Sequence, residues 1–171
     1  LGDVYKRQGE EISLLVIHNI SLPAGQFGTG DVDALFCGTL DCCKHPSYQD
    51  LEGLRVSSHF FIDRSGRLFQ YVSCLDRAWH AGVSSYEGRE NCNDFSIGVE
   101  LEGTDSAPYE QAQYETLGRL TDALAEAYPI KYVTGHSMIA PLRKTDPGPA
   151  FDWLTYESLC TTGKPLCFPY V

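Results

Sequence analysis

The 171-residue sequence lacks a long apolar run, a Cys-x-x-Cys pair and an excess of basic residues, and each absence excludes a class of protein. A membrane-spanning helix needs about 18 or more consecutive apolar residues, which the chain does not have. Its seven cysteines are an odd number at irregular spacing, so we expect reduced thiols and not a disulfide scaffold or a thiolate zinc site. With 13 Lys and Arg against 23 Asp and Glu, the formal charge is −10, which argues against nucleic acid or an anionic membrane as partner.

The composition is that of an ordinary globular domain, with 43% hydrophobic and 12% aromatic residues. A chain of this length folds as one domain and buries roughly two thirds of its unfolded surface, so it does not need a metal in order to fold. We assign residues 11–171 to this domain and treat residues 1–10 as an uncertain start. No stretch has the pattern of a secretory signal, so we expect a cytoplasmic protein.

Strand and helix patterns alternate along the chain, which predicts an α/β (α+β) fold around one sheet. The apolar, β-branched run 11–18 predicts a buried central strand, and 55–63 with 67–72 predicts a hairpin. Helical spacing of apolar residues predicts an amphipathic helix of about five turns over 109–128, ending at Pro129. The remaining expected elements are a short helix over 31–40, a loop over 41–54, a loop over 79–90, a short strand over 132–136 and a helix over 152–160.

Residues 94–102 alternate between apolar and polar side chains. Period-two alternation is typical of a strand with one face buried and one face open. We therefore expect a half-buried strand with Glu100 and Glu102 on its open face.

Two histidines, His18 and His136, follow expected strands, and Lys144 and Asp146 lie in one loop after the second. Two imidazoles and one carboxylate leave one position of a tetrahedral zinc ion for water, as in catalytic sites. Glu100 is a candidate general base for that water. Lys144 and Asp146 share one side of an extended segment, so the Lys144 ammonium is a candidate for stabilising an oxyanion.

This spacing matches none of the compact zinc signatures, so interpretations of these residues as structural or simply solvated stay open. A lone histidine is more often a hydrogen-bonded structural residue than a ligand, and a carboxylate on an open strand face is more often simply solvated. His59 fits a structural role, whereas His80 fits either a place in the substrate cleft or a brace for its loop. Glu102 competes with Glu100 as the base.

Six segments resemble the AmpD family of zinc-dependent 1,6-anhydro-N-acetylmuramyl-L-alanine amidases, in register from about Ser13 to Trp153. The matching segments are 15–23 (LVIHNISLP), 55–59 (RVSSH), 77–86 (RAWHAGVSSY), 92–105 (CNDFSIGVELEGTD), 134–136 (TGH) and 143–149 (RKTDPGP). The resemblance implies a single domain with a central mixed β-sheet flanked by helices, a fold shared with peptidoglycan-recognition proteins and phage amidases.

The resemblance also implies roles for individual residues. The family's zinc ligands match His18, His136 and Asp146, its catalytic glutamate matches Glu100, and its oxyanion-stabilising lysine matches Lys144. Its substrate contacts match Asn19, Arg55, Ala78 and Ala140. The chain departs from the family pattern at Asn91, where an arginine contacts substrate, and at Ser47, where an aromatic residue is usual.

The expected function is hydrolysis of the amide between (anhydro-)N-acetylmuramic acid and the L-alanine of a soluble muropeptide, with Zn²⁺ as cofactor. The expected partner is this small molecule, with no nucleic acid or membrane, and the expected oligomeric state is a monomer. One alternative is an amidase acting on intact peptidoglycan, as a lysin or a periplasmic enzyme. Another is a muropeptide-binding module without catalytic activity.

Overall fold

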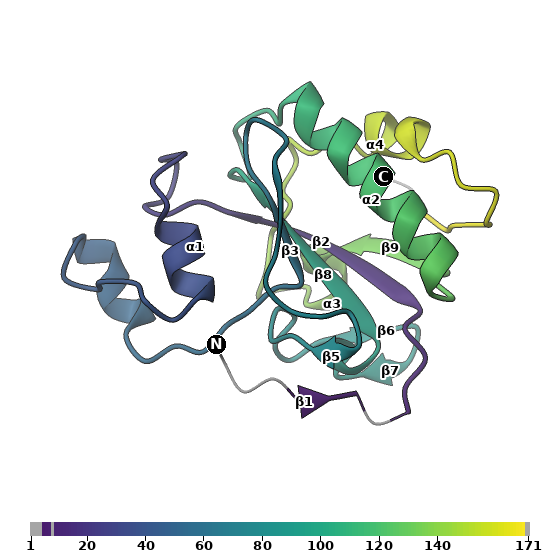
Figure 1. Ribbon diagram of the computed structural model, residues 1–171, viewed down its shortest axis with the longest axis horizontal. Coiled ribbons are helices and arrows are strands. Elements are labelled where there is room, and N and C mark those ends of the chain that lie inside the picture. The colour runs from purple at the N-terminus through teal and green to yellow at the C-terminus, as the bar shows by residue number, and fades with distance from the viewer. Residues whose placement is uncertain (1–4, 8, 170–171) are drawn as a thin grey trace.

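A five-stranded mixed sheet forms the centre of the molecule in the computed structural model, which describes residues 5–7 and 9–169 (Figure 1). The strand order is β4-β3-β8-β2-β9. These strands are β2 (Leu14–Ile20), β3 (Phe60–Ile62), β4 (Leu68–Gln70), β8 (Ser96–Glu102) and β9 (Tyr132–Gly135). β3, β8, β2 and β9 run parallel, whereas β4 pairs with β3 in an antiparallel hairpin. The predicted α/β class, with one mixed sheet, is confirmed.

The strand β8 differs from the expected half-buried strand, because every residue from Ser96 to Glu102 is buried. The sheet is covered on both faces, as parallel sheets commonly are. The polar side chains of β8 therefore face protein groups and not bulk water. The alternation in the sequence distinguishes two buried faces of different polarity.

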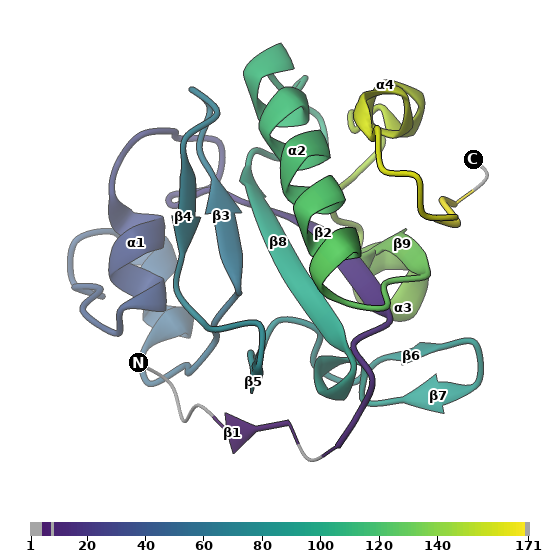
Figure 2. The same ribbon diagram turned by 45° about the vertical axis from the view of Figure 1, so that its right-hand side comes forward.

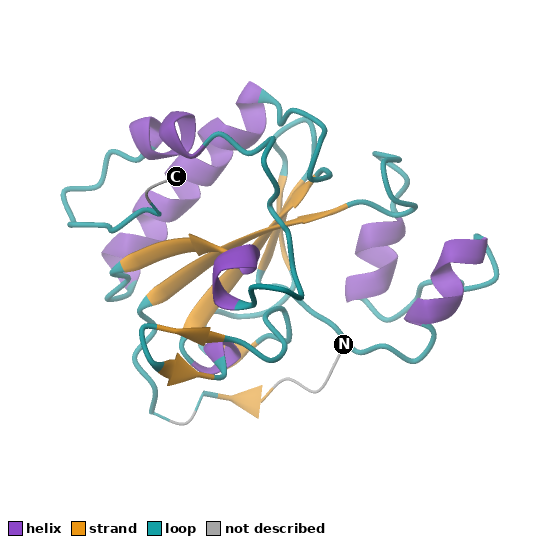
Figure 3. Ribbon diagram, turned by 180° about the vertical axis from the view of Figure 1, so that it is seen from behind, coloured by secondary structure: helices purple, strands orange, loops and turns teal. Residues whose placement is uncertain are grey.

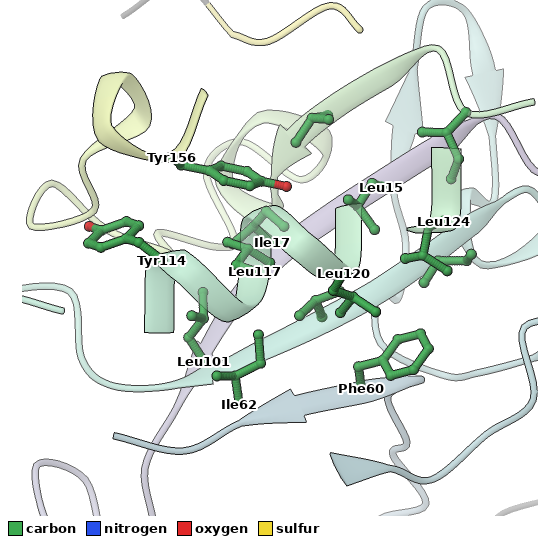
Figure 4. Close-up of a cluster of buried hydrophobic side chains, with 14 of the residues drawn as sticks. Leu15, Ile17, Phe60, Ile62, Leu101, Tyr114, Leu117, Leu120, Leu124 and Tyr156 are labelled. Atoms are coloured by element: carbon green, nitrogen blue, oxygen red, sulfur yellow. The ribbon is translucent and has the colours of Figure 1, made fainter. Parts of the chain in front are cut away.

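The apolar face of the sheet packs against α2 (Gln111–Ala127) and α4 (Trp153–Leu159). Figure 2 shows α2 crossing this face with α4 beside it. Figure 4 shows how Leu117, Leu120 and Leu124 of α2 point onto the side chains of the strands. Burying apolar surface stabilises the folded state by about 25 cal/mol per Å². The buried leucine and isoleucine side chains therefore hold in place the sheet that carries the polar residues on its other face.

The opposite face carries shorter elements, which Figure 3 shows from behind. They are α3 (His136–Ile139), the small hairpin of β6 (Ser85–Tyr86) and β7 (Arg89–Glu90), and the 3-10 turn η2 (Cys92–Asp94). A second apolar cluster, which includes Val16, Phe95 and Ile139, joins them to the sheet. The expected loop over 79–90 thus contains a two-stranded hairpin.

Beyond β3 and β4, the helix α1 (Asp31–Phe36) and the 3-10 helix η1 (Pro46–Leu51) form a lateral unit. Val32, Leu35 and Phe36 pack there against Phe61. Helix α1 is shorter than the expected 31–40, and η1 lies within the expected loop 41–54.

The segment before residue 11 is in contact with the domain. β1 (Tyr5–Lys6) pairs antiparallel with β5 (Asp76–Arg77), and the Arg7 guanidinium donates to the backbone carbonyls of Cys74, Asp76 and Ser96. The remaining residues of the assumed uncertain start include positions 1–4 and 8, which lie outside the described residues. The domain boundary at residue 11 stays a prediction.

Candidate active site

The carboxyl ends of β2, β8 and β9 open into a cleft of about 720 Å³. Reacting groups of parallel sheets gather at this edge because the strands end there together. The cleft is lined by His18 from β2, Glu100 from β8, His136 at the start of α3, and Lys144 and Asp146 from the following loop. The structure thus brings together all five residues that the sequence placed in the metal and catalytic sets.

Three ligand atoms from separate parts of the chain converge at one point. His18 Nδ1 lies 3.0 Å from His136 Nδ1 and 3.0 Å from Asp146 Oδ2, and His136 Nδ1 lies 3.1 Å from the same oxygen. Four tetrahedral ligands of a zinc ion, at roughly 2.0 to 2.1 Å from the metal, lie about 3.3 Å from one another. The triangle therefore has a size that suits a zinc ion.

The hydrogen bond on the far side of His136 shows that the donor set suits a cation. His136 Nε2 lies 3.1 Å from the carbonyl oxygen of Ala81, which can only accept, so this nitrogen carries the proton. In the neutral ring, Nδ1 is then a lone pair facing the Asp146 carboxylate. The lone pair and the carboxylate repel each other unless a positive charge lies between them, and a bound metal ion would supply that charge.

Burial and the neighbouring groups shift the titration of these residues in the way that metal binding requires. Burial lowers the pKa of His18 to about 4, and His136 lowers it further, although the nearby Asp146 carboxylate acts in the opposite direction. Burial opposes ionisation of Asp146, but the neighbouring imidazoles of His136 and His18 hold the pKa of Asp146 below its usual range. Neutral imidazole and ionised carboxylate are the forms that bind a metal ion.

Glu100 lines the cleft and Glu102 does not. Glu100 lines the cleft, is only 8% exposed, and its Oε2 has no hydrogen-bond partner among the described residues. Burial, together with the Asp146 charge, raises the pKa of Glu100 well above its usual value. The Glu102 carboxylate instead accepts from the backbone N–H groups of Gly28 and Arg64, which is a structural role.

The four residues matched to substrate contacts lie in different environments. Asn19 lines the cleft, and its amide donates to Asp105 and to the carbonyl of Pro147. Arg55 is exposed and lines a smaller neighbouring pocket. Ala78 and Ala140 are buried, and the Ala140 carbonyl accepts from the backbone N–H of Lys144. Their role in binding substrate stays a prediction.

The two departures from the family pattern are both exposed positions. Asn91 has a φ of 58°, in the left-handed region that asparagine tolerates better than most residues. Ser47 lies in the first turn of η1, where its hydroxyl faces the His45 ring at 2.8 Å. Neither residue lines the cleft.

Three further residues line the cleft for which no role was predicted, namely Trp79, Asp105 and Arg143. The Arg77 guanidinium lies 4.0 Å from the centre of the Trp79 ring, which fixes one face of the indole. All three residues fall within motifs of the resemblance, which was the signal available in the sequence. His59 is buried, accepts from the backbone N–H of Gly98 and has the expected structural role.

The model of the N-acetylmuramoyl-L-alanine amidase family matches residues 8–149. The chain belongs to this amidase family. It is 57% identical over 154 residues to the 1,6-anhydro-N-acetylmuramyl-L-alanine amidase AmpD of Citrobacter freundii, covering 89% of this chain and 82% of that protein. The AmpD protein of Escherichia coli K12 is likewise 57% identical over 152 residues, covering 88% of this chain and 83% of that protein.

Solved structures of amidases share the fold of this family member. A selenomethionine derivative of AmpD superposes with a TM-score of 0.89 at 55% identity, covering 92% of this chain and 90% of that chain. The Escherichia coli amidase AmiD, solved with anhydro-N-acetylmuramic acid-L-Ala-D-γ-Glu-L-Lys, has a TM-score of 0.68 at 31% identity, covering 93% and 60%. Within the described part of the amidase chain, no helix has the length and apolar character needed to cross a bilayer.

Proposed function

We propose that this chain is a zinc-dependent amidase that cleaves the bond between the lactyl group of (anhydro-)N-acetylmuramic acid and L-alanine in soluble muropeptides. The observation that carries the proposal is the convergence of His18, His136 and Asp146 beside Glu100 at one end of the cleft. The names of the AmpD relatives support the same bond and sugar.

Zinc, when bound by the three ligand residues, supplies a Lewis acid that polarises a carbonyl and lowers the pKa of a water molecule toward about 7. Glu100 accepts the proton of the attacking water and later delivers it to the leaving amine of L-alanine. Its buried position and raised pKa suit a group that must hold that proton between the two steps. The Lys144 ammonium stabilises the negative charge that develops on the lactyl carbonyl oxygen.

The size and charge of the molecule favour a small substrate over the polymer. A cleft of about 720 Å³ lies within the range of roughly 300 to 1,000 Å³ that is usual for small-molecule sites. The net charge of −10 opposes binding to an anionic cell wall. We extend the proposal to a monomer that acts in the cytoplasm, where a reducing environment suits seven free thiols.

The test uses purified protein, metal analysis and product masses. We expect one zinc per chain and release of anhydro-N-acetylmuramic acid and free tripeptide from the anhydromuramyl tripeptide. Turnover of intact sacculi in preference to the soluble substrate would assign the protein to the polymer-acting amidases. Muropeptide binding without turnover by zinc-loaded protein would assign it to the binding modules.

A further inference from the structure

The loop segment 79–83 contacts both ligand histidines on the side away from the cluster of ligand atoms. His18 Nε2 lies 2.9 Å from His80 Nδ1, and His136 Nε2 lies 3.1 Å from the Ala81 carbonyl oxygen. Each ligand ring thus points Nδ1 at the cluster and Nε2 at one of two consecutive residues. Hydrogen bonds of this kind fix the tautomer and orientation of a metal-binding histidine.

The two consecutive residues are themselves held by one side chain. Asn93 Oδ1 accepts from the backbone N–H of His80 at 3.1 Å and from that of Ala81 at 2.9 Å. Asn93 is only 2% exposed, so these hydrogen bonds are shielded from water. On the other side, the Arg143 guanidinium donates to the carbonyls of Ala81 and Val83.

The strand β8 leaves room for the His80 ring at a glycine. A Cβ atom on Gly98 would lie 2.5 Å from His80 Cγ and 2.6 Å from Nδ1, which is far inside contact distance. His80 Nε2 lies 3.1 Å from the Ser96 hydroxyl, which can either donate or accept. The ring is therefore fixed in place, while its tautomer is free to match what His18 requires.

We propose that His80 and the Ala81 carbonyl, aligned by Asn93 and accommodated by Gly98, are positioning groups that hold His18 and His136 with Nδ1 as the metal-binding atom. This inference rests on the proposed zinc site. With Nδ1 of His18 committed to the metal, its Nε2–H donates to His80 Nδ1, and His80 Nε2–H donates to Ser96. In the sequence motif Trp-His-Ala-Gly, the side chain of His80 thus holds His18 and the backbone carbonyl of Ala81 holds His136.

The test measures the zinc dissociation constant by chelator competition and the unfolding of the metal-free protein in urea. His80→Phe keeps an aromatic ring but removes the acceptor, and we expect zinc affinity to fall by about 10 to 100-fold. His80→Asn places an acceptor near the position of Nδ1 and should recover most of that loss. Asn93→Leu should weaken zinc binding, and Asn93→Asp, which keeps Oδ1, should restore it.

Gly98→Ala and Gly118→Ala form a matched pair that separates positioning from general stability. Both substitutions place a methyl group too close to buried atoms, at 2.5 Å from the His80 ring and 2.7 Å from the Leu159 carbonyl respectively. We expect both to destabilise the metal-free protein and only Gly98→Ala to weaken zinc binding. Nitrogen-15 spectra of the imidazoles should show protonated Nε2 on His18 and His136 in zinc-loaded wild type.

The outcomes distinguish the two proposals. The positioning role alone would be overturned if the wild type binds zinc and is active but His80→Phe has the same zinc affinity. It would also be overturned if Gly98→Ala and Gly118→Ala lose zinc affinity equally. Failure of the wild-type protein to bind zinc would overturn the zinc amidase proposal and this inference with it.

Discussion

His18 and Glu100 are Cα partners on the adjacent parallel strands β2 and β8. Their side chains therefore leave the same face of the sheet at the same height, which places the proposed ligand and the proposed general base beside one another. A shift of one residue in this register would turn both side chains to the opposite face. The apolar partners along these strands, such as Ile17 opposite Val99, fix the register through their burial against α2.

Replacement of Glu100 tests the assignment of the base. Glu100→Gln and Glu100→Ala should lower kcat by about 10² to 10⁴-fold, because general acid–base catalysis contributes on that scale. Zinc content should stay at the wild-type level, since Glu100 is not among the three ligand residues. Glu102→Gln is the matched control and should keep its turnover, because Glu102 binds two backbone N–H groups outside the cleft. Retained activity in Glu100→Ala would move the base elsewhere.

Removal of the metal tests the ligand set. Treatment with a strong chelator should abolish hydrolysis, and added zinc should restore it. His136→Ala and Asp146→Ala should bind zinc far more weakly than wild type, because each removes one of the three proposed ligands. Wild-type protein should also gain thermal stability with zinc concentration, since a ligand at about 100 times its Kd adds roughly 2.7 kcal/mol. A zinc-dependent shift of equal size in Asp146→Ala would contradict the assignment of that carboxylate.

The pH dependence of stability follows from the environment of Glu100. Burial and the Asp146 charge raise its pKa in the folded, metal-free protein, whereas in the unfolded chain its pKa is about 4.3. Above that pH the folded state holds more protons than the unfolded state, so this group lowers stability as pH rises toward its folded pKa. A glutamine side chain does not ionise, so Glu100→Gln does not lose stability in this way. Urea unfolding with chelator present should show the variant matching wild type near pH 4 and exceeding it increasingly toward pH 7.

A difference in the free energy of unfolding between Glu100→Gln and wild type that stays constant from pH 4 to pH 7 would show that Glu100 titrates alike in both states. The buried carboxylate would then need a partner that compensates its desolvation.

Lys144 is exposed in the cleft, so its substitution should leave the fold intact. Lys144→Met should lower kcat by about 10² to 10³-fold, the usual effect of losing one group that stabilises an oxyanion. KM and zinc content should change little, because the charge on the carbonyl oxygen develops only in the transition state. Steady-state kinetics on the anhydromuramyl tripeptide separates the two constants. A rise in KM at constant kcat would instead assign Lys144 to substrate binding.

Local patterns in the sequence predicted the main strands and the long helix. The short, β-branched apolar run before His18 is typical of a buried central strand, and α2 has the spacing of a helix with one buried side. The alternation over 94–102 predicted the strand but not its second covered face. That face is buried by η2, which directly precedes β8, and by α3 and the 79–83 segment, whose packing on the strand no local pattern specifies.

The site itself was only partly predictable from the residues alone. His18 and His136 are 118 positions apart, and their meeting depends on the parallel pairing of β2 with β9, which no local pattern specifies. The family resemblance implied that pairing indirectly, because it assigned both histidines to one metal site. The acceptor for His136 is a backbone carbonyl, which any residue at position 81 would provide. The side chain at this position therefore does not indicate the contact.

Asn19, a predicted substrate contact, is hydrogen-bonded to the loop that carries the proposed ligand Asp146, so its substitution should affect both substrate and zinc binding. Its amide donates to Asp105 Oδ1 at 2.8 Å and to the Pro147 carbonyl at 3.1 Å, directly after the ligand Asp146. Asn19→Ala should raise KM and also weaken zinc binding, because the loop that carries Asp146 loses a hydrogen bond worth about 1 kcal/mol. Asp105→Ala should weaken zinc binding less, since the bond to Pro147 remains. Normal zinc affinity with a raised KM in Asn19→Ala would limit this residue to substrate binding.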